Sequence, residues 1–541
     1  MRLDGEDVHG AEGRVTFGTM AANPLCTADI IRRWGSETPD ATAMVFEGNL
    51  TTWAQLDQRS SMAANALAAT GVGNQERVVF LDKNGPTYFE VAFGVAKINA
   101  VLVAANWRLA PPELVYTIND ATAKVVIVGP DFIPVIEQIA AELTTVTKIV
   151  VIGDHPKWES YEDFVSSASA TDPGIGSAFT DVSMQLYTSG TTGLPKGVML
   201  MNSNMFTLYE EVAKYWAFDQ ASINVVAMPL FHIGGCGWAM VGMYFGGQSI
   251  IVREFVPNVV LDLMVQYRTT NALFVPAMLQ FLSMVPGAAD RDYSSMRLIT
   301  YGAAPITNET LLAAMKTFKC PFAQVYGMTE TTGAVTQLDP KDHDPSGPRA
   351  HLLRSAGRPY PWVEVRIVDM ESGADCPDGA VGEVWTRSRQ NMLGYWNKPE
   401  DTEKTIGSGG WLHTGDAGYL DTEGFLFLTD RVKDMIVSGG ENVYPAEVEN
   451  ALASFAAIAE VAVIGVPHER WGESVKAIVV LRPGMSATAP EIISFAKTQL
   501  AGYKCPTSVD FADVLPRNPS GKVLKKDLRE PFWQGYTRRV N

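Results

Sequence analysis

The sequence predicts an α/β protein with largely parallel sheets, followed by a small β-rich part and a separate small α+β domain at the C-terminal end. Short β-branched runs alternate with amphipathic stretches to about residue 350. Closely spaced, Gly-rich strands come next, and helix and strand alternate again after residue 435.

The expected elements follow from hydrophobic periodicity and from the turn residues between them. In the first part we expect strands at 76–81, 125–128, 271–275, 296–301 and 322–324, with helices at 55–69, 87–98 and 308–318. The β-rich part has expected strands at 364–369, 382–386 and 424–428. The last part has expected helices at 445–452 and 489–500 and strands at 459–465 and 474–481.

Length, charge and cysteine content restrict the class of protein. A chain of 541 residues exceeds one ordinary core, so two or more domains are expected. The formal charge of −17 disfavours nucleic acid and anionic membranes as partners. The five cysteines are odd in number and form no C-x-x-C pair, which indicates neither a disulfide framework nor a zinc site and fits a reducing cytoplasm. The segment up to Cys26 lacks the apolar core of a signal peptide.

An uncharged stretch at 223–252 is long enough to span a bilayer. Pro229, His232 and six glycines interrupt it, and such a broken segment satisfies its backbone poorly in lipid. The stretch is therefore interpreted as a strand, a tight loop and a packed helix.

The segment from Tyr187 to Gly197 reads Tyr-Thr-Ser-Gly-Thr-Thr-Gly-Leu-Pro-Lys-Gly and predicts a phosphate-binding loop. It offers many backbone N–H groups and small hydroxyls, its glycines permit close approach to phosphate, and Lys196 adds a positive charge. The G-x-x-x-x-G-K-[ST] pattern fails because Pro195 stands where glycine is needed. A surface turn is the alternative interpretation, which the length of the run disfavours.

With this loop and six further motifs in order, the sequence resembles the AMP-binding, acyl-adenylate-forming superfamily over nearly the whole chain. That superfamily includes acyl-CoA synthetases, peptide-synthetase adenylation domains and luciferase. The further motifs are Met228-Pro229-Leu230-Phe231-His232, Tyr301-Gly302-Ala303-Ala304-Pro305, Tyr326-Gly327-Met328-Thr329-Glu330, Thr414-Gly415-Asp416, Asp430-Arg431-Val432-Lys433-Asp434 and Pro519-Ser520-Gly521-Lys522.

The resemblance implies a large N-terminal adenylation domain over 1–430, made of two parallel-sheet α/β subdomains and a small β-rich subdomain. A hinge at 431–434, with Lys433 at its hinge position, would lead to a small mobile α+β lid domain over 435–541. Taken alone, the charged run at 430–434 is typical of solvated surface.

The reaction implied couples a carboxylate to the α-phosphate of ATP, releases pyrophosphate and passes the acyl group to the thiol of coenzyme A. Glu330 supplies a hard oxygen ligand for Mg²⁺, and Lys522 would bridge carboxylate and α-phosphate as charge develops. Thr188 and His232 complete the implied catalytic set. Outside these motifs, a lysine near a C-terminus or a glutamate after a turn is usually surface.

The resemblance also implies a nucleotide site in which Tyr326 stacks on adenine and Asp416 accepts the ribose hydroxyls. Its residues would be Thr188, Ser189, Gly190, Thr191, Thr192, Gly193, Lys196, Gly302, Ala303, Ala304, Gln324, Val325, Tyr326, Gly327, Met328, Thr329, Asp416, Arg431 and Lys522.

A second face would bind coenzyme A through Ser438, Gly439, Gly440 and Glu441, a segment that also fits an ordinary Gly-Gly hairpin turn. Cys505 and Thr507 stand where some acyl-CoA ligases carry basic residues. The grip on the CoA phosphates is therefore left open.

The acid pocket is expected to contain Phe231, His232, Cys236, Trp238, Gly302, Gly327, Met328 and Gly333. These residues carry no charged partner for an ammonium group, which disfavours an amino acid. Glycines at Gly302, Gly327 and Gly333 suggest room for an extended or bulky acyl group. A medium- or long-chain fatty acid is the first choice and an aryl or cinnamate-like acid the second.

Three rival functions stay open on the sequence: a stand-alone acyl-AMP ligase that loads a carrier protein, a luciferase-like oxygenase, and a non-catalytic nucleotide-binding protein on the same fold. The presence of Lys196, Glu330, Asp416, Arg431 and Lys522 disfavours the last. The expected partner is a small carboxylic acid, and a homodimer is a possible assembly.

Overall fold

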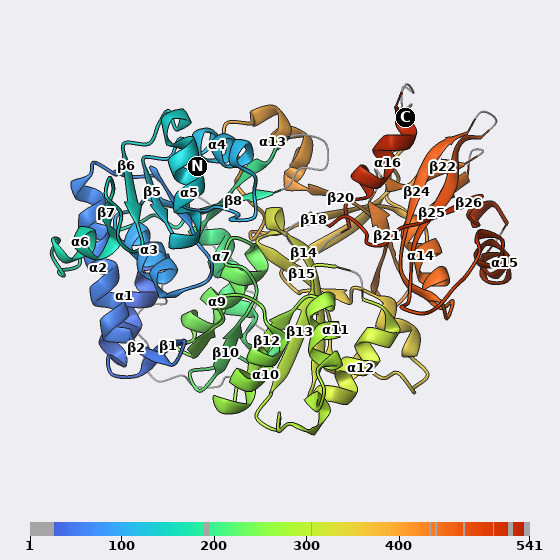
Figure 1. The fold of residues 1–541 in the computed structure, drawn as a ribbon, viewed down its shortest axis with the longest axis horizontal. Coiled ribbons are helices and arrows are strands. Elements are labelled where there is room, and N and C mark those ends of the chain that lie inside the picture. Colours follow the sequence, from blue (N-terminus) through green and yellow to red (C-terminus); the bar gives the residue numbers. More distant parts are fainter. Residues whose placement is uncertain are drawn as a thin grey trace, which may run out of the picture.

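The computed structural model describes residues 26–188, 194–304, 306–431, 434–438, 441–468, 471–500, 502–517 and 523–534. Within them the chain forms four β-sheets, three in a large N-terminal domain and one in a smaller C-terminal domain. Figure 1 shows the C-terminal domain, coloured orange to red, on one side of the larger domain. The predicted α/β class is confirmed.

The first sheet has eight strands, and its parallel part is buried on both faces. In β3 (Arg77–Leu81), Val78 and Phe80 enter one core while Val79 and Leu81 enter another, as expected of a parallel strand covered by helices on both sides. The strand order is β19 (Gly394–Tyr395), β9 (Lys196–Met201), β8 (Val182–Thr188), β4 (Val101–Ala104), β3, β5 (Val125–Val128), β6 (Lys148–Val151) and β7 (Glu159–Ser160). The pairs from β8 to β7 are parallel, whereas β9 and β19 join in antiparallel fashion.

Six α-helices precede β8 in the described chain, before or between the strands of this part of the protein. They are α1 (Thr27–Glu37), α2 (Trp53–Ala69), α3 (Pro86–Lys97), α4 (Pro111–Asp120), α5 (Ile133–Ile139) and α6 (Tyr161–Ser166). The start of α2 is determined locally, because the Thr52 hydroxyl accepts a hydrogen bond from the Gln55 N–H while the Gln55 side chain accepts one from the Thr52 N–H.

The second sheet has nine strands and is parallel in its middle. Its order is β16 (Arg358–Pro359), β15 (Gly333–Leu338), β14 (Phe322–Met328), β13 (Leu298–Gly302), β12 (Asn271–Phe274), β10 (Ile223–Val226), β11 (Gln248–Ile251), β1 (Thr42–Phe46) and β2 (Asn49–Thr52). The accompanying helices are α7 (Asn202–Glu211), α8 (Ala213–Trp216), α9 (Ile233–Tyr244), α10 (Pro257–Gln266), α11 (Pro276–Met284) and α12 (Asn308–Phe318).

The uncharged stretch at 223–252 becomes β10, a loop, α9 and β11, as interpreted from its proline and glycines. Nowhere in the described ranges is there a helix both long and apolar enough to cross a membrane.

The third sheet is antiparallel and has the order β17 (Glu364–Val368), β18 (Gly382–Arg387), β20 (Leu412–Leu420) and β21 (Leu426–Arg431). The last expected strand, 424–428, is shifted. Gly424 lies in a turn with φ of +80°, and the Asp421 carboxylate accepts the Phe425 N–H there. The strand therefore starts at Leu426 and carries part of the charged run.

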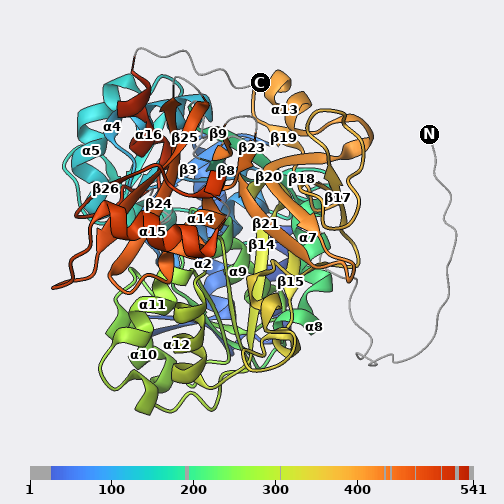
Figure 2. The same cartoon turned by 90° about the vertical axis from the view of Figure 1, so that its right-hand side faces the viewer.

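The C-terminal domain has its own sheet and core. The strand order is β23 (Glu441–Val443), β22 (Ile436–Ser438), β25 (Gly472–Leu481) and β24 (Ile458–His468), and β26 (Ser508–Phe511) also pairs with β25. Its helices are α14 (Pro445–Ala453), α15 (Ala489–Gln499) and α16 (Lys525–Trp533). Figure 2 views the molecule from this side. An ion pair of 3.2 Å between Arg482 and Glu309 joins the domain to α12. The boundary at 431–434 and the mobility of the lid stay predictions.

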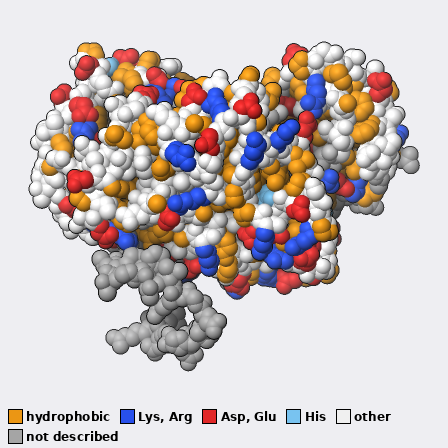
Figure 3. Space-filling view, turned by 90° about the horizontal axis from the view of Figure 1, so that it is seen from below, with side chains coloured by type: hydrophobic (Ala, Val, Ile, Leu, Met, Phe, Trp, Pro, Cys, Tyr) orange, Lys and Arg blue, Asp and Glu red, His pale blue; other side chains and the backbone are white. Residues whose placement is uncertain are grey.

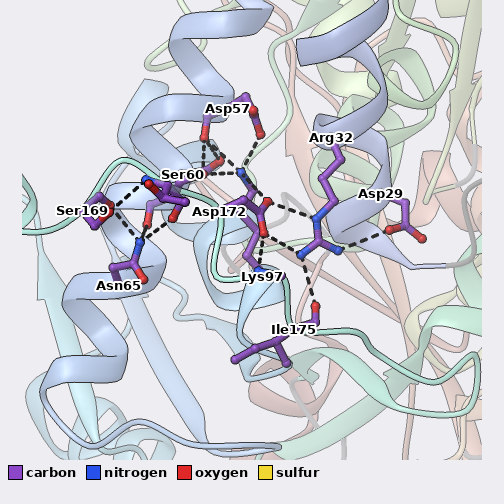
Figure 4. A network of polar contacts seen from close by, with 12 residues as sticks. Asp29, Arg32, Asp57, Ser60, Asn65, Lys97, Ser169, Asp172 and Ile175 are labelled. Carbon is purple, nitrogen blue, oxygen red and sulfur yellow. Dashed lines mark hydrogen bonds and ion pairs between the residues drawn. The ribbon is translucent and has the colours of Figure 1, made fainter.

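Charges of both signs are interspersed on the face of the molecule seen in Figure 3. One charge is fully buried instead. The Lys97 ammonium, on α3, contacts the Ser61 hydroxyl at 2.6 Å and the carboxylates of Asp57 and Asp172 at 2.5 and 3.2 Å. Figure 4 shows how Arg32 on α1 reaches the same Asp172. The cluster thus ties three helices to the segment that leads into β8.

Candidate active site

The predicted phosphate loop starts from the hairpin of β8 and β9. Thr188, the last residue of β8, pairs with Lys196, the first residue of β9. Five predicted phosphate contacts lie outside the described residues: Ser189, Gly190, Thr191, Thr192 and Gly193. The hairpin therefore gives the two ends of the loop and the position of its lysine.

Lys196 lies against two residues from a later part of the chain. Its ammonium is 2.8 Å from Asp401 Oδ1, on α13 (Pro399–Thr405), and 5.0 Å from the ring centroid of Tyr395. The hydrogen bond from Lys196 holds the pKa of the Asp401 carboxyl below its usual value. Because both side chains of this ion pair are partly exposed, its contribution to stability is at most about 1 kcal/mol.

Glu330, the predicted magnesium ligand, is buried at the end of β14, in the short 3-10 helix η4 (Thr329–Thr331). The Tyr395 hydroxyl donates a hydrogen bond of 2.9 Å to Glu330 Oε1. The Met392 N–H donates to the Glu330 carbonyl oxygen at 2.8 Å. Burial first, and then the negative charge of Glu330, raises the pKa of Tyr395. The phenol therefore stays protonated and remains a donor.

Tyr326 and Asp416, predicted for adenine and ribose, are in direct contact. The Tyr326 hydroxyl donates a hydrogen bond of 2.7 Å to Asp416 Oδ2. The Thr414 hydroxyl accepts the Asp416 N–H at 3.1 Å and donates to the Val384 carbonyl at 2.7 Å. The Thr-Gly-Asp motif thus holds its aspartate through the threonine two residues earlier.

The short segment from Tyr326 to Glu330 connects the three sheets of the N-terminal domain. It begins in the nine-stranded sheet, its Tyr326 reaches β20 of the four-stranded sheet, and its Glu330 is bound by β19 of the eight-stranded sheet. One end thus has a carboxylate suited to hydroxyl groups. The other end has a buried carboxylate and a lysine suited to a metal ion and phosphates.

Close packing of neighbouring strands leaves no room for a side chain at Gly302 or Gly327. A Cβ on Gly302 would lie 2.2 Å from the Val325 carbonyl oxygen, and one on Gly327 would lie 1.9 Å from the Gly333 carbonyl oxygen. A side chain at either position would therefore collide with a neighbouring strand. Ala303 has a left-handed backbone with φ of +65°, a conformation that non-glycine residues rarely adopt.

The remaining predicted nucleotide residues of this region lie on β14 or just beyond β13. Gln324 accepts a hydrogen bond of 3.4 Å from the Tyr301 hydroxyl, Met328 ends β14, and Thr329 begins η4. Val325 packs against the main core, and Ala304 follows the strained Ala303. Their contacts with a nucleotide stay predictions.

Two family models match the chain. The model described as AMP-binding enzyme matches residues 31–396, and that described as AMP-binding enzyme C-terminal domain matches residues 447–522. The chain belongs to the AMP-binding enzyme family. The predicted superfamily is therefore confirmed, and family membership supports the use of ATP.

Curated and solved members of the AMP-binding family match along most of their length. The fatty acid–[acyl-carrier-protein] ligase ScoC of Streptomyces coeruleorubidus is 39% identical over 93% of this chain and 96% of its own. Feruloyl-CoA synthase of Amycolatopsis sp. is 37% identical over 92% and 96%. The ATP-bound structure of MatB from Rhodopseudomonas palustris superposes with a TM-score of 0.85 at 31% identity, covering 94% of this chain and 100% of that one. These AMP-binding relatives are similar to this enzyme across both of its domains.

The predicted acid pocket of this AMP-binding enzyme starts at α9. His232 immediately precedes the helix, and its ring centroid lies 4.4 Å from that of Phe231. Burial, and then the charge of Arg108, lowers the pKa of His232 to about 4, so the imidazole is neutral at pH 7. Its Nε2 is buried with no hydrogen-bond partner in the described part of the chain. A ligand that forms a hydrogen bond with Nε2 would therefore lower the free energy of this site.

Other predicted pocket residues have contacts within the core. Cys236 Sγ is 3.6 Å from Met184 Sδ, and Trp238 packs against Trp216 and Phe218. Gly333 has φ of +100°, and a Cβ there would meet Leu208 on α7 and Ile233 on α9 at 3.7 and 3.8 Å. This last contact shows that α7, α9 and the start of β15 converge beside Glu330. The pocket assignments stay predictions.

Most of the predicted C-terminal contacts lie outside the described residues. These are Lys522, Lys433, Gly439 and Gly440. Of Arg431 and Glu441 the backbone alone is described, and Arg431 pairs with Asp416 between β21 and β20. Ser438 ends β22, where it pairs with Glu441. The backbone of Arg431 thus lies opposite that of Asp416, the residue predicted to bind the ribose.

Two site residues were missed by sequence reasoning, Tyr395 and Asp401. Both belong to the segment after Gly394, whose strand β19 is only two residues long and too short for periodicity to reveal. Backbone hydrogen bonds attach it to β9, from the Trp396 N–H to the Gly197 carbonyl at 2.8 Å and from the Leu393 N–H to the Met199 carbonyl at 3.0 Å. Only this pairing brings Tyr395 beside Glu330 and Lys196.

Proposed function

We propose that the protein is an ATP-dependent acid–CoA ligase, which activates a carboxylic acid as an acyl-adenylate and transfers the acyl group to the thiol of coenzyme A. The observation that carries the proposal is the segment from Tyr326 to Glu330, which meets Asp416 at one end and Tyr395 at the other. The two ends of a nucleoside triphosphate complement the two ends of this segment: the ribose has hydroxyl donors for Asp416, and the phosphates carry negative charge for a metal ion beside Glu330.

In this proposal, Asp416 accepts the ribose hydroxyls while Lys196 neutralises phosphate charge beside the loop at 189–193. Lys522 would arrive from the C-terminal domain to stabilise the charge that develops between the carboxylate and the α-phosphate. Arg431 would add a second positive charge near the ribose.

Magnesium fits the donor set around Glu330. Mg²⁺ is usually held by one or two carboxylates together with substrate phosphates and water, and Glu330 is a buried carboxylate of this kind. Among the described residues no group of three or more His, Cys, Asp or Glu side chains could hold a metal by itself. When bound with ATP, the ion would neutralise phosphate charge.

The acid is proposed to be a medium- or long-chain fatty acid, with an aryl or cinnamate-like acid as the alternative. The predicted pocket begins at a neutral His232 and Phe231, and none of the eight residues predicted to line it carries a charged side chain that could pair with a second ionised group on the substrate. The names of two relatives support different acids, because ScoC is named for a fatty acid and the synthase of Amycolatopsis sp. for ferulate.

A second candidate acceptor is a carrier protein, since ScoC is named as a ligase that acts on an acyl carrier protein. The deciding experiment measures AMP release for a panel of saturated fatty acids and cinnamates, each with no acceptor, with coenzyme A and with holo acyl carrier protein. Coenzyme A is expected to accelerate AMP release with at least one acid. Acceleration by the carrier alone would favour the second candidate, and AMP release that no acceptor accelerates would exclude both.

A further inference from the structure

Tyr395 lies between the two charges that are proposed to handle the phosphates of ATP. Its hydroxyl is 2.9 Å from Glu330 Oε1, and its ring centroid is 5.0 Å from the Lys196 ammonium. Tyr395 is 7% exposed and Glu330 is buried, so bulk water has little access to the hydrogen bond between them. One aromatic side chain therefore contacts a carboxylate with its polar end and a cation with its ring.

The backbone around Tyr395 is held on several sides. The Tyr395 N–H donates to the Thr402 hydroxyl at 2.9 Å, and Tyr395 pairs with Val198 of β9. Three residues earlier, the Met392 N–H bonds the Glu330 carbonyl. The same short segment thus binds both the strand that begins with Lys196 and the turn that carries Glu330. Its position determines how these two residues lie relative to each other.

The hydrogen bond from Tyr395 restricts the rotamers that the Glu330 side chain can adopt. A glutamate has three side-chain torsions, and a donor on one carboxylate oxygen restricts all of them. Outer partners of this kind orient metal-binding carboxylates, and their removal typically costs ten- to hundredfold in metal affinity. Because the donor is a neutral phenol, it orients the carboxylate without cancelling its charge.

We propose that Tyr395 is a positioning residue that holds the Glu330 carboxylate in place for magnesium on the ATP phosphates and keeps the Lys196 ammonium beside it. This inference rests on the proposed function, in which Glu330 and Lys196 act on ATP. Tyr395 acts through these two residues and contacts neither the acid nor the acceptor in this proposal.

The test is equilibrium binding of ATP without any acid, by isothermal titration calorimetry, in excess Mg²⁺ and in excess EDTA. The dissociation constant in EDTA divided by that in Mg²⁺ reports how strongly magnesium supports ATP binding. Tyr395→Phe, which removes only the hydroxyl, is expected to reduce this ratio about tenfold. Tyr161→Phe is the matched control, because the buried Tyr161, the first residue of α6, donates a similar hydrogen bond of 3.0 Å to the carboxylate of Glu90 on α3. It is expected to leave the ratio unchanged.

A double-mutant cycle with Glu330→Gln separates positioning from a general loss of structure. If Tyr395 acts through the Glu330 carboxylate, Tyr395→Phe changes the ratio little once Glu330 is glutamine. An unchanged ratio in Tyr395→Phe, or an equal effect in both backgrounds, would overturn the proposal. Binding is measured without acid, so this result stands apart from the AMP-release assay, whose failure would count against the ligase reaction alone.

Discussion

The hydroxyl of Tyr326 donates a hydrogen bond of 2.7 Å to the carboxylate of Asp416, and this bond joins the nine-stranded sheet to the four-stranded one. The tyrosine directs a single donor at one oxygen of the aspartate. A ribose would donate two hydrogen bonds to the same carboxylate, one from each hydroxyl. The contribution of each can be measured with ATP analogues that lack a hydroxyl.

Asp416→Ala is expected to lower kcat/KM for ATP by roughly ten- to hundredfold, because hydrogen bonds to a charged group contribute about 1.5–3 kcal/mol. The measurement is pyrophosphate release at varied ATP and at varied 2′-deoxy-ATP. Wild-type enzyme should prefer ATP, whereas Asp416→Ala should distinguish the two nucleotides much less. A variant that retains the full preference for ATP would show that Asp416 does not bind the ribose.

Lys522→Ala is expected to reduce acyl-AMP formation by at least about a hundredfold while the fold is kept, because it removes a charge aimed at the developing transition state. Pyrophosphate release measures this step, and the circular dichroism spectrum checks the fold. Lys525→Ala is the matched control, since that lysine is ion-paired with Glu449 at 2.9 Å. Full pyrophosphate release by Lys522→Ala would refute the assignment.

His232 is expected to make the protein less stable as the pH falls from about 6.5 to about 4. Its folded pKa is about 4, whereas an unfolded histidine titrates near 6.5, so in this window the unfolded chain takes up a proton that the folded chain does not. The loss is about 3 kcal/mol in full, about 2 kcal/mol of it by pH 5, and it stops growing below the folded pKa.

Urea unfolding of wild-type protein and His232→Gln at pH 7 and pH 5 measures this contribution. The free energy of unfolding should fall less in the variant between the two pH values. Some decline should remain, because burial also lowers the pKa of His343. An identical decline in both proteins would mean that His232 titrates normally in the folded state.

The buried cluster at Lys97 predicts an asymmetry between its cation and its carboxylates. The Lys97 side chain is fully buried, whereas those of Asp57 and Asp172 are 32% and 30% exposed. Water can therefore solvate the carboxylates when the lysine is lost, but it cannot reach the lysine when both carboxylates are lost.

The double variant Asp57→Asn/Asp172→Asn is expected to lose about 3–5 kcal/mol of stability, the usual cost of leaving a buried charge unpaired. Lys97→Met should lose less, about 1–3 kcal/mol, since its former partners keep contact with water. Lys148→Met, which breaks a half-exposed pair with Glu159, should lose at most about 1 kcal/mol. Chemical denaturation of the three variants ranks them, and the reverse order for the first two would contradict this account.

Much of the fold was predictable because its signals are local. The buried run at 125–128 and the helix at 308–318 coincide with β5 and α12, since a parallel strand and an amphipathic helix each carry their own pattern. The boundary of β21 was not predictable from periodicity, because the turn around Asp421 and Gly424 determines where the strand begins.

Sequence by itself determined the family and the residue types of the predicted site, because phosphate, ribose and magnesium would each require particular groups at short spacing, as in the motif that ends at Glu330. Tertiary structure alone decided which residues meet. Tyr395 reaches Glu330 from 65 positions away, and Asp401 reaches Lys196 from α13, the helix that follows β19, both through the pairing of β19 with β9. Gly302 and Gly327, interpreted from the sequence as room for substrate, are required by neighbouring strands. Such contacts depend on how distant strands pack, and no local pattern records that.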